Sequence, residues 1–258
     1  MKTPEGSAKS SNSLIGVERT ARILSAVADS EVGNLTEIAR RTELNEATVL
    51  RYLNSLSALG YVERFNANQY RLGWEIFRLG QRAFSNQVPS DVVLPTMERL
   101  MDEFNETVNF AVHKDRSVVI LEVVEGRRAV TKVSDVGQTD PWHASALGKA
   151  LLATMPDSVW HDVVASAGMP ELTTHTITSM KKMAAEIKEI RHRGFAVDRE
   201  EAAEELTCVA AAVPTPSGGS SRYALSISFL THRLDPEKLE RAGAQAIAAA
   251  GEIATKLP

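Results

Sequence analysis

The sequence predicts two domains, a winged helix-turn-helix followed by an α+β domain built on one antiparallel sheet. Three observations lead to this fold class. Residues 17–72 read as helix, helix, turn, helix and hairpin. Residues 107–230 contain strand-like runs with helices before, between and after them. A polar stretch with a proline, "SNQVPSD", separates the two parts, and 258 residues are enough for two ordinary domains.

The predicted organisation has four segments. Residues 1–12 are small and polar and form a disordered N-terminal tail. Residues 13–73 form the winged helix-turn-helix domain. Residues 74–88 form a linker helix and linker, which Pro89 ends. Residues 89–258 form the second domain.

The first predicted helix, "VERTARILSAVAD", has apolar residues at three-to-four spacing that would form one face: Val17, Ala21, Leu24, Val27 and Ala28. A shorter helix, "TEIARRTE", follows, and Thr36 is suited to cap its N-terminus. A short break at "LN" separates this helix from the next one.

The third predicted helix begins after Asn45, a suitable N-cap, and ends before Gly60, which favours left-handed geometry. Its apolar residues repeat with a helical period and should face the core: Val49, Leu50, Leu53, Leu56 and Leu59. Two strands, "YVERF" and "QYRL", are joined by "NAN", which predicts a hairpin. "WEIFRLGQRAF" continues as an amphipathic helix.

The second domain opens with a predicted helix, "VVLPTMERLMDEFNE", and a hairpin of "TVNFAVHK" and "SVVILEVVEG". "RAVTKVSDVG" is a third strand candidate. "HASALGKALLATMP" and "MKKMAAEIKEIRHRG" read as helices, the latter ended by Gly194. The strands "FAVD", "LTCVAAAV" and "YALSISFL" precede a long C-terminal helix, with Asp235 as cap and Pro236 at its first position.

The composition is that of an ordinary globular protein and restricts the available chemistry. Apolar residues make up 43% of the chain and charged residues 24%. The single cysteine, Cys208, excludes an intramolecular disulfide and argues against a cysteine-based zinc site, so we expect no metal and no cofactor. The cytoplasm is the simplest compartment. No apolar run approaches the roughly 20 residues of a membrane span, and no signal peptide is evident.

The net charge of −4 is unevenly distributed along the chain. Residues 1–80 contain ten Lys and Arg against nine Asp and Glu, while the remainder contains nineteen against twenty-four. From Leu14 to Gly80 every basic residue is arginine, whose planar guanidinium suits phosphates and base edges. The acidic excess therefore lies outside the predicted winged domain.

The exposed face of the third helix is the expected DNA contact, because a recognition helix places its N-terminal residues against base edges. Arg51 can pair with guanine or phosphate, and Thr48 can bond a phosphate or meet a thymine methyl. Winged helices also serve as protein-binding adaptors, and that alternative stays open on pattern alone. The expected DNA-binding residues are Thr36, Arg40, Arg41, Asn45, Ala47, Thr48, Arg51, Tyr52, Asn68, Gln69 and Arg71.

The run from "IGVERTARILSAVAD" through "LTEIARRTELNEATVLRYLNSLSALGYVERFNANQYRLG" resembles the N-terminal domain of the IclR family of bacterial transcription regulators. In the second half "ETVNFAV", "HASALGKALLA", "IRHRGFAVDREE", "LTCVAAAV" and "ALSIS" occur in the family's order and spacing. The resemblance covers about residues 14–257. It implies a dimerising linker helix, a GAF-like effector-binding domain, and dimers or dimers of dimers on palindromic double-stranded operators. Repression or activation, and contact with RNA polymerase, stay open.

The resemblance also implies a small-molecule site in the second domain. Backbone amides near Ala146 and Leu147 should form an anion site suited to a carboxylate. The expected ligand is a small organic acid or acid derivative, aromatic if Trp142 stacks on it. The expected effector-binding residues are Trp142, His143, Ala146, Leu147, Asp198, Leu206, Cys208, Ser226 and Ser228.

Several of these residues have plainer interpretations. Without the resemblance, Cys208 reads as a small core residue and Asp198 as a cap. Ser226 and Ser228 lie two apart on a strand and face one side, which could be solvent.

The chain departs from the family's pattern at two places. Asn45-Glu46-Ala47 stands where the family usually has Pro-Lys-Ser, so an acid replaces a phosphate-binding lysine. Glu46 could accept from a cytosine amino group, but we prefer the simpler interpretation that it favours the helix dipole. Asp140-Pro141-Trp142-His143 stands where the family often has Leu-Pro-Leu/Met-His. Asp140 would disfavour a second carboxylate nearby unless it faces solvent.

The competing function class is a hydrolase-like enzyme, with Cys208, His143 and Asp198 as nucleophile, base and orienting group. No local spacing supports this arrangement. A thiol in the middle of an apolar strand also tends to be inert. We therefore expect no catalytic residues.

Overall fold

The structure, a computed structural model, describes residues 14–29, 33–84, 90–114, 117–129 and 134–257. The chain divides into two compact units, residues 1–87 and 88–258, which are treated separately below. The tail predicted for residues 1–12 and the linker at residues 85–88 lie outside the described residues.

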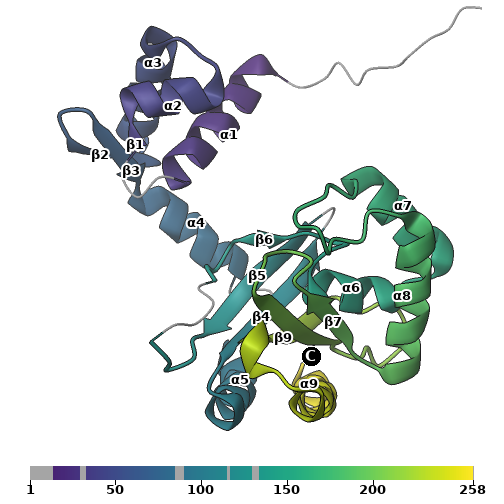
Figure 1. Cartoon of the computed structure of the whole chain (residues 1–258). Helices are drawn as coiled ribbons and strands as arrows, with labels where there is room; N and C mark the ends of the chain where they lie inside the picture. Colours follow the sequence, from purple (N-terminus) through teal and green to yellow (C-terminus); the bar gives the residue numbers. More distant parts are fainter. Residues whose placement is uncertain (1–13, 30–32, 85–89, 115–116, 130–133, 258) are drawn as a thin grey trace, which may run out of the picture. The chain divides into compact units, whose positions relative to one another are not determined.

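The first unit has the predicted winged helix-turn-helix order (Figure 1). Its three-stranded antiparallel sheet has the order β1-β3-β2, in which β1 was not predicted because it is only two residues long. The elements are α1 (Ile15–Ala28), β1 (Gly33–Asn34), α2 (Leu35–Thr42), α3 (Glu46–Ala58), β2 (Val62–Asn66), β3 (Gln69–Leu72) and α4 (Trp74–Phe84).

The residues that are buried in this unit differ from the predicted apolar faces of two helices. In α1 the buried residues are Ile23, Ala26 and Val27, and of the predicted face only Val27 is buried. The reason is that, among the described residues, burial of α1 is confined to its C-terminal half. In α3, Val49, Leu53 and Leu56 are buried as predicted. The other two predicted core residues flank that narrow stripe and are exposed: Leu50 and Leu59.

The helix caps explain where α2 and α3 begin. The Asn45 side chain accepts a hydrogen bond from the Thr48 amide at 2.8 Å, which confirms the predicted N-cap of α3. The cap of α2 is Asn34, whose side chain accepts from the Glu37 amide at 2.8 Å. The prediction of Thr36 as this cap was therefore wrong by two residues.

The second unit is the predicted α+β domain. Its six-stranded antiparallel sheet has the order β6-β5-β4-β9-β8-β7, with α5 and α9 on one face and α6 and α8 on the other (Figure 1). The elements are α5 (Ser90–Phe104), β4 (Thr107–Lys114), β5 (Ser117–Val124), β6 (Thr139–Asp140), α6 (Ala146–Ala153), α7 (Asp157–Ala167), α8 (Met180–Arg193), β7 (Ala196–Arg199), β8 (Leu206–Ala212), β9 (Tyr223–Leu230), η1 (Thr231–Arg233) and α9 (Pro236–Lys256).

Two predicted elements of this unit need correction, and one helix was missed. The described part of the strand candidate at 128–137 forms bends and a turn, and its residues 130–133 lie outside the described residues. The strand that pairs with β5 is instead β6. The helix predicted from residue 143 begins at Ala146, and α7 was missed because only Trp160 and Val164 mark its buried side.

Strand β9 contributes side chains to both faces of the sheet. Its odd-numbered residues are large and apolar, and the Phe229 ring meets Phe104 of α5 edge-on at 5.8 Å. The even-numbered residues Ala224, Ser226 and Ser228 are small and lie on the face that carries α6, where Ala224 joins the core. Ser226 and Ser228 therefore share the face that carries α6. No helix of the described residues is long and apolar enough to cross a membrane.

Candidate functional site

In the first unit, the N-terminal ends of α2 and α3 and the turn of the β2–β3 hairpin lie close together. The Thr36 hydroxyl donates to Glu46 Oε1 at 2.7 Å, which links the two helix ends. The Leu35 amide donates to the Asn68 carbonyl at 3.3 Å. Thr36, Asn68 and Gln69 line one hollow between α2 and the hairpin turn. The structure thus brings together predicted DNA-binding residues from three elements.

Most arginines of this surface are already engaged. Glu37 accepts hydrogen bonds from both Arg40 and Arg41, which lower the pKa of Glu37 to about 2. Arg71 is paired with Glu63 at 2.8 Å. Arg51 is exposed, and its side chain forms no hydrogen bond or ion pair with any residue that the structure describes. Its guanidinium is therefore available to a phosphate or a base edge.

The other predicted residues differ in their surroundings. Ala47 is exposed, and Asn45 uses its side chain as the cap of α3. Gln69 accepts from the Asn66 amide group at 2.8 Å. Tyr52 packs against the core and, like Arg51, lines a groove between α1 and α3.

In the second unit, a cavity of about 180 Å³ lies at the N-terminus of α6. The Ser145 side chain caps α6 by accepting from the Gly148 amide at 3.0 Å. The amides of Ala146 and Leu147 have no hydrogen-bond partner among the described residues, as is usual in a first helical turn. Six of the predicted effector-binding residues line this cavity: Ala146, Leu147, Asp198, Leu206, Cys208 and Ser226.

The remaining three predicted residues do not line the cavity. Trp142 is only 3% exposed and meets the His113 ring edge-on at 5.0 Å, so it offers no stacking face to a ligand there. His143 Nε2 bonds the Pro170 carbonyl at 2.9 Å. The Ser228 hydroxyl accepts from Cys208 Sγ at 3.3 Å, behind the cavity wall.

The backbone around Trp142 explains its orientation. A Cβ on Gly148 would lie 2.6 Å from the Trp142 carbonyl oxygen and 2.7 Å from its Cα. The segment before α6 therefore rests directly on that helix, and only glycine permits the contact. Because the backbone is held there, the indole lies in the core cluster.

Sequence reasoning missed further residues of this site. Asn109 is buried on β4 across from Ser226, and its Nδ2 donates to Ser228 Oγ at 3.3 Å. A polar residue inside the apolar run "VNFAV" was the available signal. Asn109 does not itself line the cavity. The lining residues outside the predicted effector-binding set are Gln138, Thr139, Asp140, Pro141, Ser145, Leu172, Ala202 and Ala203.

The carboxyl groups give the cavity its electrostatic character. Asp198 is 1% exposed and accepts from the Glu201 amide at 2.8 Å, and burial raises its pKa to about 7. Asp140 also lines the cavity, whereas none of its described lining residues is Lys, Arg or His. The α6 amides and the Ser226 hydroxyl are thus the donors that the wall offers to a ligand. This arrangement suits a ligand whose acceptor group faces the α6 amides and whose donor group faces the carboxyl groups of Asp140 and Asp198.

A buried ion pair lies behind Asp198. Lys149 of α6 is fully buried, and its Nζ lies 2.5 Å from Glu201 Oε1 and 2.7 Å from the Val197 carbonyl. Because Glu201 donates its amide to Asp198, the cavity wall and α6 are joined through this pair.

The enzyme alternative finds no support in these contacts. His143 is bonded to a backbone carbonyl and Cys208 to a serine hydroxyl, so Cys208, His143 and Asp198 do not form a catalytic triad. Among the residues that the structure describes, no cluster of side chains could hold a metal ion.

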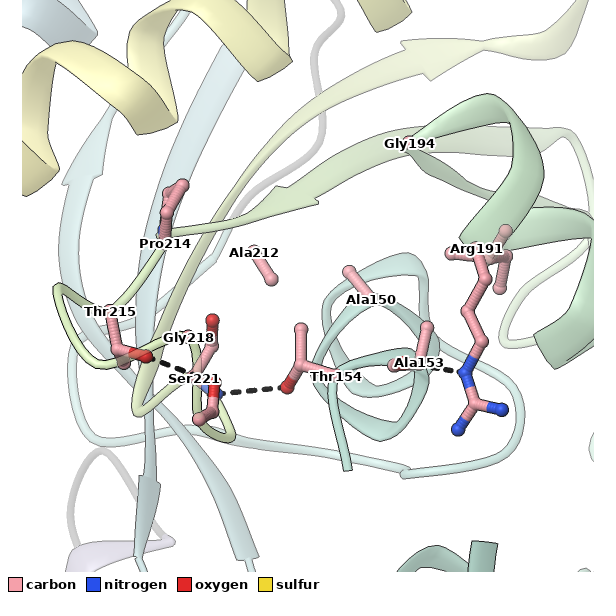
Figure 2. A pocket seen from close by; sticks show the side chains of 12 residues that line it. Ala150, Ala153, Thr154, Arg191, Gly194, Ala212, Pro214, Thr215, Gly218 and Ser221 are labelled. Atoms are coloured by element: carbon pink, nitrogen blue, oxygen red, sulfur yellow. Dashed lines mark hydrogen bonds between the residues drawn. The ribbon is translucent and has the colours of Figure 1, made fainter. Parts of the chain in front are cut away.

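A second hollow, of about 340 Å³, lies between α6, α8 and the loop before β9 (Figure 2). Its polar groups bond one another, as Figure 2 shows. The Ser221 amide donates to Thr154 Oγ1 at 2.9 Å, and Arg191 Nε donates to the Ala153 carbonyl at 2.8 Å. None of the predicted effector-binding residues lines this hollow, and we assign it no ligand.

Two family models match different parts of the chain. The family model described as "Bacterial transcriptional regulator IclR C-terminal" matches residues 83–255, and the "IclR helix-turn-helix domain" matches residues 16–64. The transcriptional regulator KdgR of Escherichia coli K12 is 28% identical over 96% of this chain and 95% of its own. The transcriptional repressor AllR of the same strain is 28% identical over 87% of this chain and 83% of its own.

Solved structures show the same fold over more than nine tenths of the chain. The Thermotoga maritima IclR structure has a TM-score of 0.75 and 25% identity, and covers 94% of this chain and 98% of its own. An IclR homologue from Microbacterium hydrocarbonoxydans, complexed with 4-hydroxybenzoate, has a TM-score of 0.78 and 24% identity. The match covers 93% of this chain and 98% of that homologue. These relatives are transcriptional regulators and not enzymes. The chain belongs to the IclR family of bacterial transcriptional regulators, with a helix-turn-helix DNA-binding domain and a C-terminal effector domain.

Proposed function

We propose that this chain is a ligand-responsive regulator that acts in the cytoplasm and binds a palindromic operator as a dimer or tetramer. The observation that carries the proposal is the surface formed by α2, α3 and the hairpin turn, where Arg51 is exposed and unpaired among the described residues. Arg51 contacts a guanine or a phosphate, and Thr48 and Ala47 lie beside it on α3. Arg40 and Arg41 can bind phosphates only if their hydrogen bonds to the Glu37 carboxylate are replaced by hydrogen bonds to DNA.

A gel-shift titration on the chain's own upstream DNA tests this proposal. Arg51→Ala should lower the affinity by about 1–3 kcal/mol, because one charged contact is lost while the fold is intact. Arg19→Ala is the matched control, since Arg19 lies on α1 and is likewise unpaired among the described residues. Full sequence-specific affinity in the Arg51→Ala variant would contradict this assignment.

We further propose that apolar side chains on α1 and α4 form the contact between two copies. Trp74 is 72% exposed, Phe77 is 55% exposed, and their rings meet edge-on at 5.4 Å. Leu14 and Ile15 are also exposed. Such large apolar groups are more stable when covered. Light scattering after size exclusion should give a smaller mass for Trp74→Glu than for the wild type, whereas Val159→Glu, at an exposed site of the second unit, should change nothing.

The effector that we propose is a small organic acid or acid derivative bound in the 180 Å³ cavity. Its carboxylate or carbonyl accepts from the free amides of Ala146 and Leu147 at the positive end of α6. An apolar cavity of roughly 150 Å³ holds benzene, so one aromatic ring is near the upper limit. Asp140 and Asp198 disfavour a second carboxylate and favour a hydroxyl or amide at the far end of the ligand.

Calorimetry with three probe classes tests the effector class: 4-hydroxybenzoate, neutral benzamides or hydrazides, and short 2-oxo acids. Ser226→Val should weaken binding of whichever probe occupies the cavity, because it removes a donor from the wall. Thr215→Val, in the second hollow, is the control. Binding of 2-oxo acids without aromatic acids would contradict an aromatic effector.

The regulatory mechanism is linkage between the two sites. A ligand that favours one arrangement of the domains or copies shifts the DNA affinity by the coupling free energy, typically about 1–3 kcal/mol. The same coupling must appear as tighter or weaker ligand binding in the presence of operator DNA. Equal calorimetric affinities with and without operator would contradict it.

A further inference from the structure

The acid at the start of α3 is held in place without a cationic partner. Glu46 is the first residue of α3 and is exposed, and its Oε1 accepts from the Thr36 hydroxyl at 2.7 Å. Four other acids of this unit pair with arginines: Glu37, Glu43, Glu63 and Glu75. Glu46 forms no ion pair within the described part of the chain. Its carboxylate is therefore oriented by a neutral donor and keeps its negative charge uncompensated.

An acid that only complements the helix dipole does not need this arrangement. The dipole is satisfied by an acid anywhere in the first turn, whatever the side-chain orientation. The Asn45 cap already satisfies the Thr48 amide. The hydrogen bond from Thr36 instead fixes one carboxylate oxygen between the N-terminal ends of α2 and α3. The second oxygen, Oε2, is left as an acceptor at the edge of the recognition helix.

One DNA group suits such an acceptor best. Phosphates repel a carboxylate, and guanine and thymine present acceptors at their major-groove edges. Adenine has an N6 amino donor, but the neighbouring N7 acceptor repels a carboxylate. The cytosine N4 amino group is a donor, and carboxylates are its usual side-chain partner. Residues at the N-terminus of a recognition helix are the ones that contact base edges.

We propose that Glu46 reads a cytosine in the major groove, with Thr36 as the positioning residue that orients its carboxylate. This inference rests on the proposed DNA-binding function. It departs from our own first interpretation of Glu46, in which the side chain only favours the helix dipole.

The test is binding-site selection from a random duplex library with the purified full-length protein, followed by affinity measurements on single-base variants of the selected site. The wild type should select a cytosine at one symmetric position in each half-site. Glu46→Gln should lose this preference and move toward adenine, which pairs with an amide. Its affinity for the cytosine site should fall about 5- to 150-fold, the usual effect of one base contact. Glu43→Gln, an exposed acid paired with Arg22, is the matched control and should keep the cytosine.

Thr36 gives an independent readout of orientation. Thr36→Val should reduce discrimination between cytosine and the other bases, and Thr36→Ser should restore it because the hydroxyl returns. An unchanged base preference in Glu46→Gln would overturn the inference. An equal gain in the affinity of Glu46→Gln for every DNA sequence would also overturn it, because the wild-type carboxylate would then only repel the DNA phosphates. If the wild type selects no sequence at all, the proposed function itself fails, and this outcome is distinct from the other two.

Discussion

Replacing Asp198 by asparagine should change how the stability of the second unit depends on pH. Asp198 is 1% exposed, and burial raises its pKa from 3.8 to about 7. In the unfolded chain the group ionises near pH 4, whereas in the folded chain it keeps its proton until about pH 7. The unfolded state thus binds fewer protons between these values, so the free energy of unfolding falls as pH rises from about 4 to about 7.

The size of the effect follows from the two pKa values. Each pH unit between them corresponds to about 1.4 kcal/mol, so the wild type should lose about 4 kcal/mol across this range through Asp198 alone. Asparagine cannot ionise, and its Oδ1 can still accept from the Glu201 amide, which lies 2.8 Å from Asp198 Oδ1. Asp198→Asn should therefore be close to the wild type at about pH 4 and more stable by about 4 kcal/mol at about pH 8.

Urea unfolding at both pH values measures this difference. The fluorescence of Trp142 and Trp160 reports on the second unit, because both indoles are buried there. Glu204→Gln, at an exposed position in the same loop, is the control and should leave the pH dependence unchanged. An Asp198→Asn effect of the same size at both pH values would refute the reasoning, because it would show that the carboxyl does not titrate in this range.

Three further substitutions test the packing around the two sites. Lys149→Met leaves Glu201 buried without its cation and should cost about 3–5 kcal/mol in urea unfolding; a cost below about 1 kcal/mol would contradict the buried pair. Gly148→Ala places a Cβ 2.6 Å from the Trp142 carbonyl oxygen and should cost about 1–3 kcal/mol in thermal melting. Asn45→Ala removes the cap of α3 and should cost the first unit about 1 kcal/mol, measured by circular dichroism, with Asn45→Ser retaining most of that stability.

The elements with strong local signals were predictable from the sequence. Asn45 has the chemistry of an N-cap, and "YALSISFL" has the composition of a strand, so α3 and β9 occur where predicted. The relation of Ser226 to Ser228 was also predictable, because a strand has a period of two. Local chemistry and backbone period are properties that a short segment carries by itself.

Features that depend on neighbours distant in sequence were not predictable. Val17 belongs to an apolar stripe of α1, yet it is 63% exposed, because the residues that the structure describes bury only the C-terminal part of that helix. The orientation of Trp142 depends on its contact with Gly148, and that contact is not visible as a spacing. The hydrogen bond between Thr36 and Glu46 joins two helices. Each helix taken alone predicts another role, a cap for Thr36 and a helix-dipole contact for Glu46.

The two faces of β9 restrict how this protein can diverge. Substitutions at Ser226 alter the cavity wall while Leu225 and Ile227, on the other face, keep the core filled. Inserting or deleting one residue in the strand would exchange the two faces and turn large apolar side chains into the cavity. New ligand preferences can therefore arise in this strand by point mutation, whereas changes in its length would be eliminated together with the fold.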